Sequence, residues 1–84
     1  MMDQKYHINI TICYQDHPEK EYDLRVSTHQ TVKKFILDLD ETLHIVRQKA
    51  TTFQLKVENK GLLLSDNQRI HDFPVTTGDK IFIY

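Results

Sequence analysis

The fold is decided by residues 22–43, which read YDLRVSTHQTVKKFILDLDETL. At the start of this stretch Tyr22, Leu24 and Val26 alternate with polar residues, and a period of two is typical of a half-buried β-strand. Further on, apolar residues recur three or four positions apart, so they share one face of a helix. These residues are Val32, Phe35, Ile36, Leu39 and Leu43. The stretch therefore predicts a strand followed by an amphipathic helix that covers the sheet.

The helix is predicted over Val32–Leu43, directly after Thr31. Thr31 suits the N-cap position because its hydroxyl oxygen can accept a hydrogen bond from a backbone N–H of the first turn. A helix of this length covers about one face of a small sheet. We therefore expect the opposite sheet face, which we call the open face, to contact solvent.

More strands are predicted on both sides of this stretch. Before it, isoleucines alternate with polar residues over 6–14, which predicts a strand. A turn over 15–20 would join this strand to the one at 22–26 as a hairpin. After the helix, alternating apolar residues and short apolar runs predict three strands, over 53–58, 62–64 and 80–84.

The connecting segments differ in character. Residues 46–52 are largely polar and are expected to form a loop after the helix. Gly61 can take a positive φ angle, which suits the tight turn predicted over 59–61. Residues 65–77 mix turn formers with spaced apolar anchors, which predicts an irregular segment packed on the domain. The anchors are Ile70, Phe73 and Val75.

Length and composition restrict the class of protein. A chain of 84 residues has room for one domain, predicted over 1–84. The composition, with 39% hydrophobic and 27% charged residues, is that of a folded soluble protein. A net charge of -1 gives no general attraction to nucleic acids or anionic membranes. Because the apolar runs are far shorter than a membrane-spanning helix requires, no membrane insertion is expected.

Catalytic and metal chemistry find little support in the sequence. Cys13 could serve as a nucleophile with His17 as its base, but no third group orients them, so an inert strand cysteine on the open face is predicted. A single cysteine and no secretory leader indicate a reducing cytosol. The five histidines lack the spacing of a metal site. They are His7, His17, His29, His44 and His71. We expect no enzyme activity, cofactor or metal.

The outer surface of the helix is predicted to be mixed in charge and solvated. Two small basic clusters, Lys33–Lys34 and Arg47–Lys49, are separated by acidic residues. The acidic residues are Asp38, Asp40 and Glu41. Such a surface lacks the basic stripe of a nucleic-acid-binding module, so no nucleic-acid partner is expected. A small regulatory module that binds RNA or DNA is kept as an alternative.

The order of elements is strand, strand, helix, two strands, an irregular segment and a last strand. One helix against four or five strands predicts an α+β fold of the β-grasp type, with a mixed four- to five-stranded sheet and the helix on one face. The chain resembles ubiquitin almost element for element. Ubiquitin and the sulfur-carrier proteins act through a tail ending in Gly-Gly, whereas this sequence ends at Tyr84. Conjugation is therefore not expected, and a β-grasp carrier or modifier whose tail is missing here is another alternative.

Three stretches resemble the small YukD-like and EsaB-like ubiquitin-like proteins of Gram-positive type VII secretion systems. They are residues 8–12, INITI; residues 22–26 leading into 32–36, VKKFI; and residues 60–64, KGLLL, followed by Gly78-Asp79. The resemblance implies a non-conjugated accessory or adaptor protein of a type VII (WXG100/Esx) secretion system that acts by protein contact. It also implies a cytoplasmic location, peripheral to the membrane complex. The implied partners are membrane-bound secretion components, the motor ATPase or a multi-pass subunit.

The candidate interaction residues lie on the open face. If Ile81 and Ile83 point inward, Phe82 and Tyr84 must point outward, because side chains alternate along a strand. Exposed aromatic side chains often anchor interfaces, with a second protein or in a homodimer. The first and last strands of a β-grasp sheet are neighbours, so polar residues are expected beside Phe82. They are Asn9 and Thr11 on one side, and Lys56 and Glu58 on the other.

Overall fold

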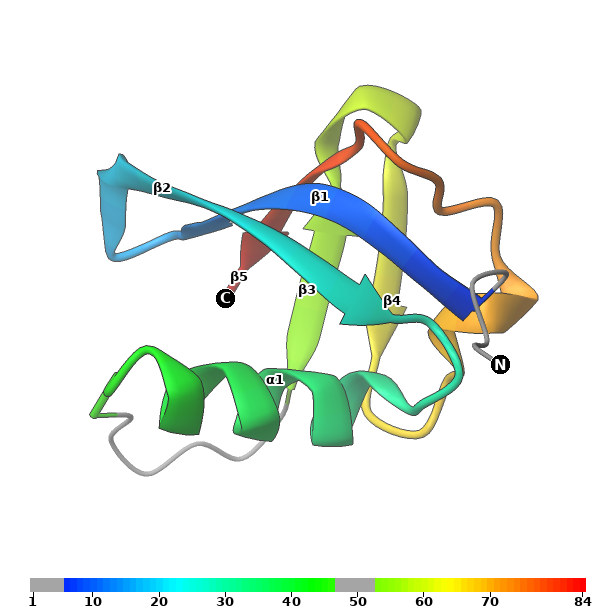
Figure 1. Cartoon of the computed structure of the whole chain (residues 1–84), viewed down its shortest axis with the longest axis horizontal. Helices are drawn as coiled ribbons and strands as arrows, with labels where there is room; N and C mark the ends of the chain where they lie inside the picture. The colour runs from blue at the N-terminus through cyan, green and yellow to red at the C-terminus, as the bar shows by residue number, and fades with distance from the viewer. Residues whose placement is uncertain (1–5, 47–52) are drawn as a thin grey trace.

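The computed structural model describes residues 6–46 and 53–84. The strands in these ranges are β1 (His7–Tyr14), β2 (His17–Ser27), β3 (Gln54–Val57), β4 (Leu62–Ser65) and β5 (Lys80–Ile83). They form a mixed sheet in the order β2-β1-β5-β3-β4 (Figure 1). β1 and β5 run parallel, and the other neighbouring pairs are antiparallel. The predicted pairing of the first strand with the last is confirmed.

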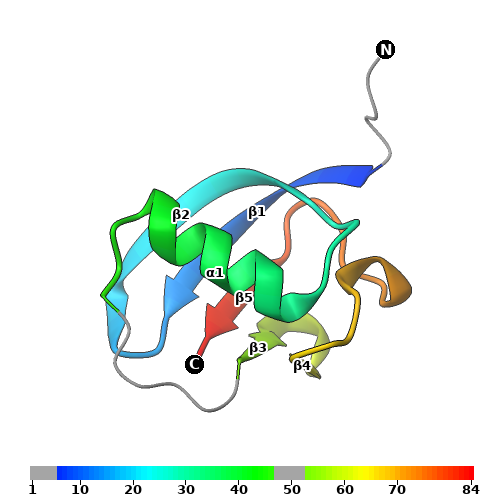
Figure 2. The ribbon, with the colours of Figure 1, turned by 90° about the horizontal axis from the view of Figure 1, so that it is seen from below.

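The helix α1 (Val32–Thr42) lies against one face of this sheet, as seen from below in Figure 2. The side-chain oxygen of Thr31 accepts a hydrogen bond from the N–H of Lys34 at 3.3 Å, which confirms the predicted N-cap. The helix ends at Thr42, one residue earlier than predicted, and Leu43 is its C-cap. One sheet face is thus covered and the other is left open, as the pattern of residues 22–43 predicts.

The core lies between α1 and the inner sheet face. Phe35 and Ile36 on the helix are 1% and 0% exposed, and Ile81 and Ile83 on β5 are 0% and 1% exposed. The inward direction predicted for both isoleucines is therefore confirmed. The remaining core residues are Ile10, Ile12, Tyr14, Val32, Leu39, Leu55, Val57, Leu64, Ile70 and Val75.

The hairpin between β1 and β2 is tighter than predicted. Tyr14 pairs with His17, so the turn is shorter than the expected 15–20 and β2 is eleven residues long. The first five residues of β2 are all exposed and carry no apolar alternation, so a hydrophobic pattern could not reveal them. Pro18 falls within β2, where an edge strand tolerates the missing N–H.

An irregularity in the β1–β2 pair accompanies the burial of Cys13. The register shifts between Ile12 and Tyr14, because β2 carries extra residues there. Ile12, Cys13 and Tyr14 are all buried. Cys13 lies opposite Phe82 of β5, as a residue of the open face should, but its side chain is 0% exposed. The expected solvent exposure of this thiol is therefore wrong.

The segments after the helix largely follow the predictions. Gly61 takes a φ angle of 65° after a short 3-10 helix, η2 (Glu58–Lys60), which confirms the tight turn. In the irregular segment, Ile70 begins a second 3-10 helix, η3 (Ile70–Asp72); Ile70 and Val75 are buried and Phe73 is partly buried. In the predicted loop, Val46 is exposed, whereas residues 47–52, with the basic pair Arg47 and Lys49, lie outside the described residues.

Candidate interaction face

Apolar side chains of β5 and β4 lie on the open face, with Lys56 of β3 between them. Lys56 of β3 pairs with Phe82 of β5 on one side and with Leu63 of β4 on the other, so these three side chains form a row across the sheet. Leu63 is 58% exposed and Phe82 is partly buried. Tyr84, just beyond β5, is 41% exposed, and its N–H donates to the carbonyl of Gln54 at 3.1 Å. The predicted outward direction of Tyr84 is confirmed, whereas Phe82 is less exposed than predicted.

Lys80 partly covers Phe82. The Lys80 ammonium lies 5.4 Å from the centroid of the Phe82 ring, within range of a cation–π interaction. The same ammonium donates to the carboxylate of Glu21 at 2.9 Å. Because β1 lies between β5 and β2, this ion pair spans β1. The hydrogen bond to Glu21 raises the pKa of Lys80 above 10.5, so the lysine is charged at neutral pH.

Asn9 and Thr11 lie beside Lys80 and the preceding turn, rather than beside Phe82 as predicted. β1 and β5 are parallel, and their register places Thr11 opposite Lys80. The N–H of Asn9 donates to the hydroxyl oxygen of Thr77 at 3.2 Å. The prediction placed Asn9 and Thr11 at the level of Phe82 along the sheet. The relative offset of two strands that are distant in the chain cannot be inferred from the apolar pattern of either strand.

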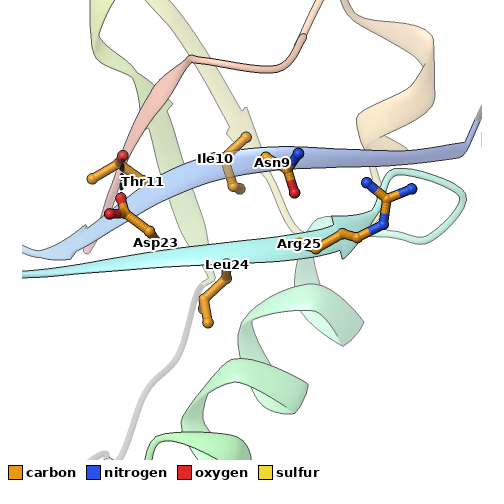
Figure 3. Close-up of a pocket in the computed structure, with 6 residues that line it drawn as sticks. All are labelled: Asn9, Ile10, Thr11, Asp23, Leu24 and Arg25. Atoms are coloured by element: carbon orange, nitrogen blue, oxygen red, sulfur yellow. Dashed lines mark hydrogen bonds between the residues drawn. The ribbon is translucent and has the colours of Figure 1, made fainter.

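Thr11 has a specific partner on β2. Its hydroxyl donates to the carboxylate of Asp23 at 2.7 Å across the β1–β2 pair. Figure 3 shows this bond beside Asn9 and Arg25, with Leu24 pointing toward α1. A shallow hollow of about 280 Å³ lies at this part of the β1–β2 pair. It is lined by Asn9, Ile10, Thr11, Asp23, Leu24 and Arg25.

Glu58 lies outside the strand in which it was predicted. β3 ends at Val57 and Glu58 begins η2, because the chain turns there toward Gly61. Its charge helps to raise the pKa of Lys80. Of the two residues predicted on this side of Phe82, Lys56 is the one that pairs with it.

A polar cluster fixes the turn that leads into β5. Asp79 is 3% exposed, and its carboxylate accepts hydrogen bonds from the Asn59 side chain at 2.8 Å and from the N–H of Thr76 at 2.9 Å. The ammonium of Lys60 lies 2.8 Å from the same carboxylate. Burial opposes ionisation of Asp79, but these hydrogen bonds and the charge of Lys60 outweigh it and hold the pKa below 3.8. The cluster connects η2 to the start of β5 and so positions the open face.

A second polar contact corrects the prediction of a solvated helix surface. Asp40 is only 8% exposed, and its carboxylate accepts a hydrogen bond from the Tyr14 hydroxyl at 2.9 Å. The side chain of Asp40 therefore faces the sheet, since Tyr14 is a core residue of β1. Lys34 and Asp38 are exposed as predicted and form an ion pair at 3.3 Å.

The surroundings of Cys13 and of two histidines show which groups these side chains contact. In the described parts of the chain, no group of three or more histidine, cysteine, aspartate or glutamate side chains is arranged to hold a metal ion. The rings of His29 and His71 lie 6.1 Å apart, and both contact Tyr6. The thiol of Cys13 lies 3.3 Å from the carbonyl oxygen of Pro18.

Burial predicts slow chemistry at Cys13. We expect a thiol reagent such as dithionitrobenzoate to label the folded chain at least about a hundredfold more slowly than the chain in denaturant, because the thiol must first be exposed by local or global opening. Timed labelling with and without urea measures the ratio. Equal rates would show that Cys13 is accessible in the folded protein.

Leu63 is the exposed apolar residue of the open face that the sequence reasoning missed. The run Leu62–Leu64 looks uniformly apolar, so it predicts a strand without indicating which side chain points outward. The signal was the alternation within the run: Leu64 is buried, so Leu63 must point to the opposite face.

The comparisons with known proteins agree with this architecture. The family model described as "WXG100 protein secretion system (Wss), protein YukD" matches residues 7–83. The chain belongs to the YukD family. The type VII secretion system accessory factor EsaB of Staphylococcus aureus (strain Newman) is 32% identical to it over 73 residues, which cover 87% of this chain and 90% of the relative.

Solved structures support the ubiquitin-like fold of this YukD-family chain. A structure described by the phrase "Molecular Mimicry of SUMO promotes DNA repair" superposes with a TM-score of 0.72 at 16% identity, covering 94% of this chain and 91% of the other. The ubiquitin of Caldiarchaeum subterraneum superposes with a TM-score of 0.65 at 22% identity, covering 92% and 90%. The predicted β-grasp fold is therefore confirmed. In the described residues, α1 is too short and too polar to cross a membrane, and no other helix could do so.

Proposed function

We propose that this chain is a cytoplasmic, non-conjugated adaptor of a type VII secretion system, which uses its open face to contact a membrane-bound component of that system. Membership of the YukD family and similarity to a secretion accessory factor support the system. The exposed apolar side chains on the open face support the mode of action, which is protein contact without turnover chemistry. The partner is the motor ATPase or a multi-pass subunit.

The observation that carries the proposal is the exposure of Leu63 and Tyr84 on the same sheet face as the partly exposed Phe82. Apolar side chains gathered on one face of a small protein are typical of an interaction surface. Aromatic residues within such a patch tend to contribute most of the binding free energy. Phe82 therefore serves as the central anchor in this proposal, with Leu63 and Tyr84 around it.

Polar residues border these apolar side chains and give the surface its selectivity. Lys56 lies within the row and offers a positive charge to the partner. Asn9 and Thr11 form a polar edge on β1, and Glu58 forms one at η2. Because a hydrogen-bonding group that is buried without a partner is costly, a polar edge favours partners whose own polar groups match it.

The proposal predicts the effect of Phe82→Ser. Loss of this anchor should weaken capture of the secretion component by about 1–3 kcal/mol, roughly five- to 150-fold in affinity. The measurement is capture of detergent-solubilised membrane proteins on tagged chain, identified by mass spectrometry, followed by titration of the captured component. Circular dichroism and urea unfolding confirm that the variant is folded.

Leu37→Ser is the matched control for this experiment. Leu37 is an apolar residue of α1 that is 45% exposed, so its replacement removes surface apolar area outside the open face. We expect this variant to capture the component as well as the unchanged chain does. Equal losses in both variants, or no loss with Phe82→Ser at equal folded concentration, would refute the role of the open face.

A further inference from the structure

β2 forms one edge of the sheet and is its longest strand. It has eleven residues, against four in β4 at the other edge. Asn9 and Thr11 of β1 lie opposite Arg25 and Asp23 of β2. Their backbone N–H and C=O groups nevertheless point away from β2, toward the β5 side of β1. The carbonyl of Asn9 accepts from the N–H of Gly78 at 2.9 Å, and the N–H of Thr11 donates to the carbonyl of Asp79 at 3.0 Å.

This pattern fixes the direction of the backbone groups in β2. In an antiparallel pair, hydrogen-bonded and non-hydrogen-bonded residue pairs alternate. The pairs of Arg25 and Asp23 with β1 are of the second kind, so Tyr22, Leu24 and Val26 direct their N–H and C=O groups to β1. The N–H and C=O groups of Glu21, Asp23 and Arg25 consequently point away from β1, outward from the edge of the sheet. This edge has the geometry that another strand requires for pairing.

The side chains of this edge are self-complementary. We propose that β2 pairs in antiparallel fashion with β2 of a second copy, centred on Leu24, so that Asp23 of each chain faces Arg25 of the other. Both side chains are exposed and point to the open face. A two-fold axis through this centre creates two equivalent ion pairs, because an isologous interface uses every contact twice. The dimer joins two five-stranded sheets into one.

Charge distinguishes this register from its neighbours. Shifting the second copy by two residues in one direction would place Asp23 opposite Asp23, although it would also place Arg25 opposite Glu21. Shifting it in the other direction would place Arg25 opposite Arg25. Like charges directly opposite each other destabilise a strand pair, whereas opposite charges stabilise it. The proposed register is the one of these three that pairs Asp23 with Arg25 directly.

Existing contacts are compatible with the pairing. One carboxylate oxygen of Asp23 accepts from Thr11, and the other oxygen can accept from a second donor. Arg25 already interacts within its own chain, and its guanidinium carries five N–H donors.

The face beneath the edge is apolar. Tyr22, Leu24 and Val26 are partly buried on the α1 side of β2. Between β2 and α1 runs a groove of about 320 Å³, with Phe35 and Leu39 on its helix side. In the proposed register Leu24 faces Leu24 of the second copy, and Tyr22 faces Val26 of it. These cross-strand contacts would cover apolar area that the single chain leaves partly in solvent.

Charge reversal tests this register directly. Sedimentation equilibrium of the full chain, from micromolar to millimolar concentration, should show a monomer–dimer equilibrium. The affinity of the dimer should fall as the salt concentration rises, because salt screens the ion pairs. Asp23→Arg and Arg25→Asp should each weaken dimerisation by about tenfold or more, because each converts two ion pairs into like-charge contacts. An equimolar mixture of the two variants should form a heterodimer of about the original affinity. In that heterodimer the arginine introduced into one chain faces the aspartate introduced into the other, and the second ion pair is made by the unchanged residues.

Two controls separate this dimer from other outcomes. Asp72→Arg makes the same charge change at an exposed residue of η3 and should leave the dimer unchanged. Phe82→Ser should also leave it unchanged, and loss of the dimer in this variant would instead place the contact on the open face. A monomer at every concentration, a dimer insensitive to the reversals, or a mixture that stays monomeric would each overturn the proposal. None of these outcomes bears on capture of the secretion component.

Discussion

Replacing Phe35 by alanine is expected to lower the free energy of unfolding by about 3–5 kcal/mol. Phe35 is the largest fully buried side chain in the part of the chain that the structure describes, and it is 1% exposed, in the middle of the helix face that packs on the sheet. Its truncation removes apolar contacts and leaves a cavity that the surrounding residues fill only in part. Since small domains have about 5–15 kcal/mol of stability, the loss would consume much of the total.

Urea unfolding followed by far-UV circular dichroism measures this loss. Leu37→Ala on the same helix is the control, because Leu37 is 45% exposed and its truncation should change the stability by about 0.5 kcal/mol or less. The two variants are two residues apart and share the same helix. A loss of similar size in both would mean that α1 does not pack on the sheet through the face that contains Phe35.

The periodicity of the sequence was sufficient to predict the layers of the fold. The change from a period of two to a period near 3.6 after Val26 identifies one strand and the buried face of α1. These patterns are local, and each reflects a single surface that must be buried. Turn residues such as Gly61 are equally local, so the short connections were also predictable.

The candidate site depends on non-local geometry, which periodicity does not contain. Thr11 was predicted beside Phe82 but lies opposite Lys80, because the register between β1 and β5 is set by the turn before β5. That register relates two strands that are distant in sequence. Cys13 is buried beside the register shift between β1 and β2, and extra residues in one strand of a pair leave no signature in the apolar pattern. The inward direction of Asp40 depends on its hydrogen bond with Tyr14. Because these two residues are far apart in sequence, the spacing of residues within either element could not identify the contact.

The second large effect is expected at the turn that leads into β5. Asp79→Ala should lower the free energy of unfolding by about 2–4 kcal/mol. The substitution removes the buried acceptor of the Asn59 and Thr76 hydrogen bonds and the counter-ion of Lys60. A partly buried cation that loses its counter-ion, together with hydrogen-bond donors that lose a buried acceptor, is costly. Asp72→Ala, at an exposed position, is the control and should change the stability by about 0.5 kcal/mol or less.

The pH dependence of this difference identifies the charge of Asp79 as its source. The folded state holds the pKa of Asp79 below 3.8, so the unfolded chain takes up the proton first as the pH falls. The stability that the carboxylate contributes is therefore fully present above pH 3.8 and is lost as the pH falls through the lower folded-state pKa. Urea unfolding of the unchanged chain and Asp79→Ala should show a constant gap above this pH and a shrinking gap below it. A gap that stays constant into strong acid would mean that Asp79 stabilises the turn through its shape and neutral hydrogen bonds alone.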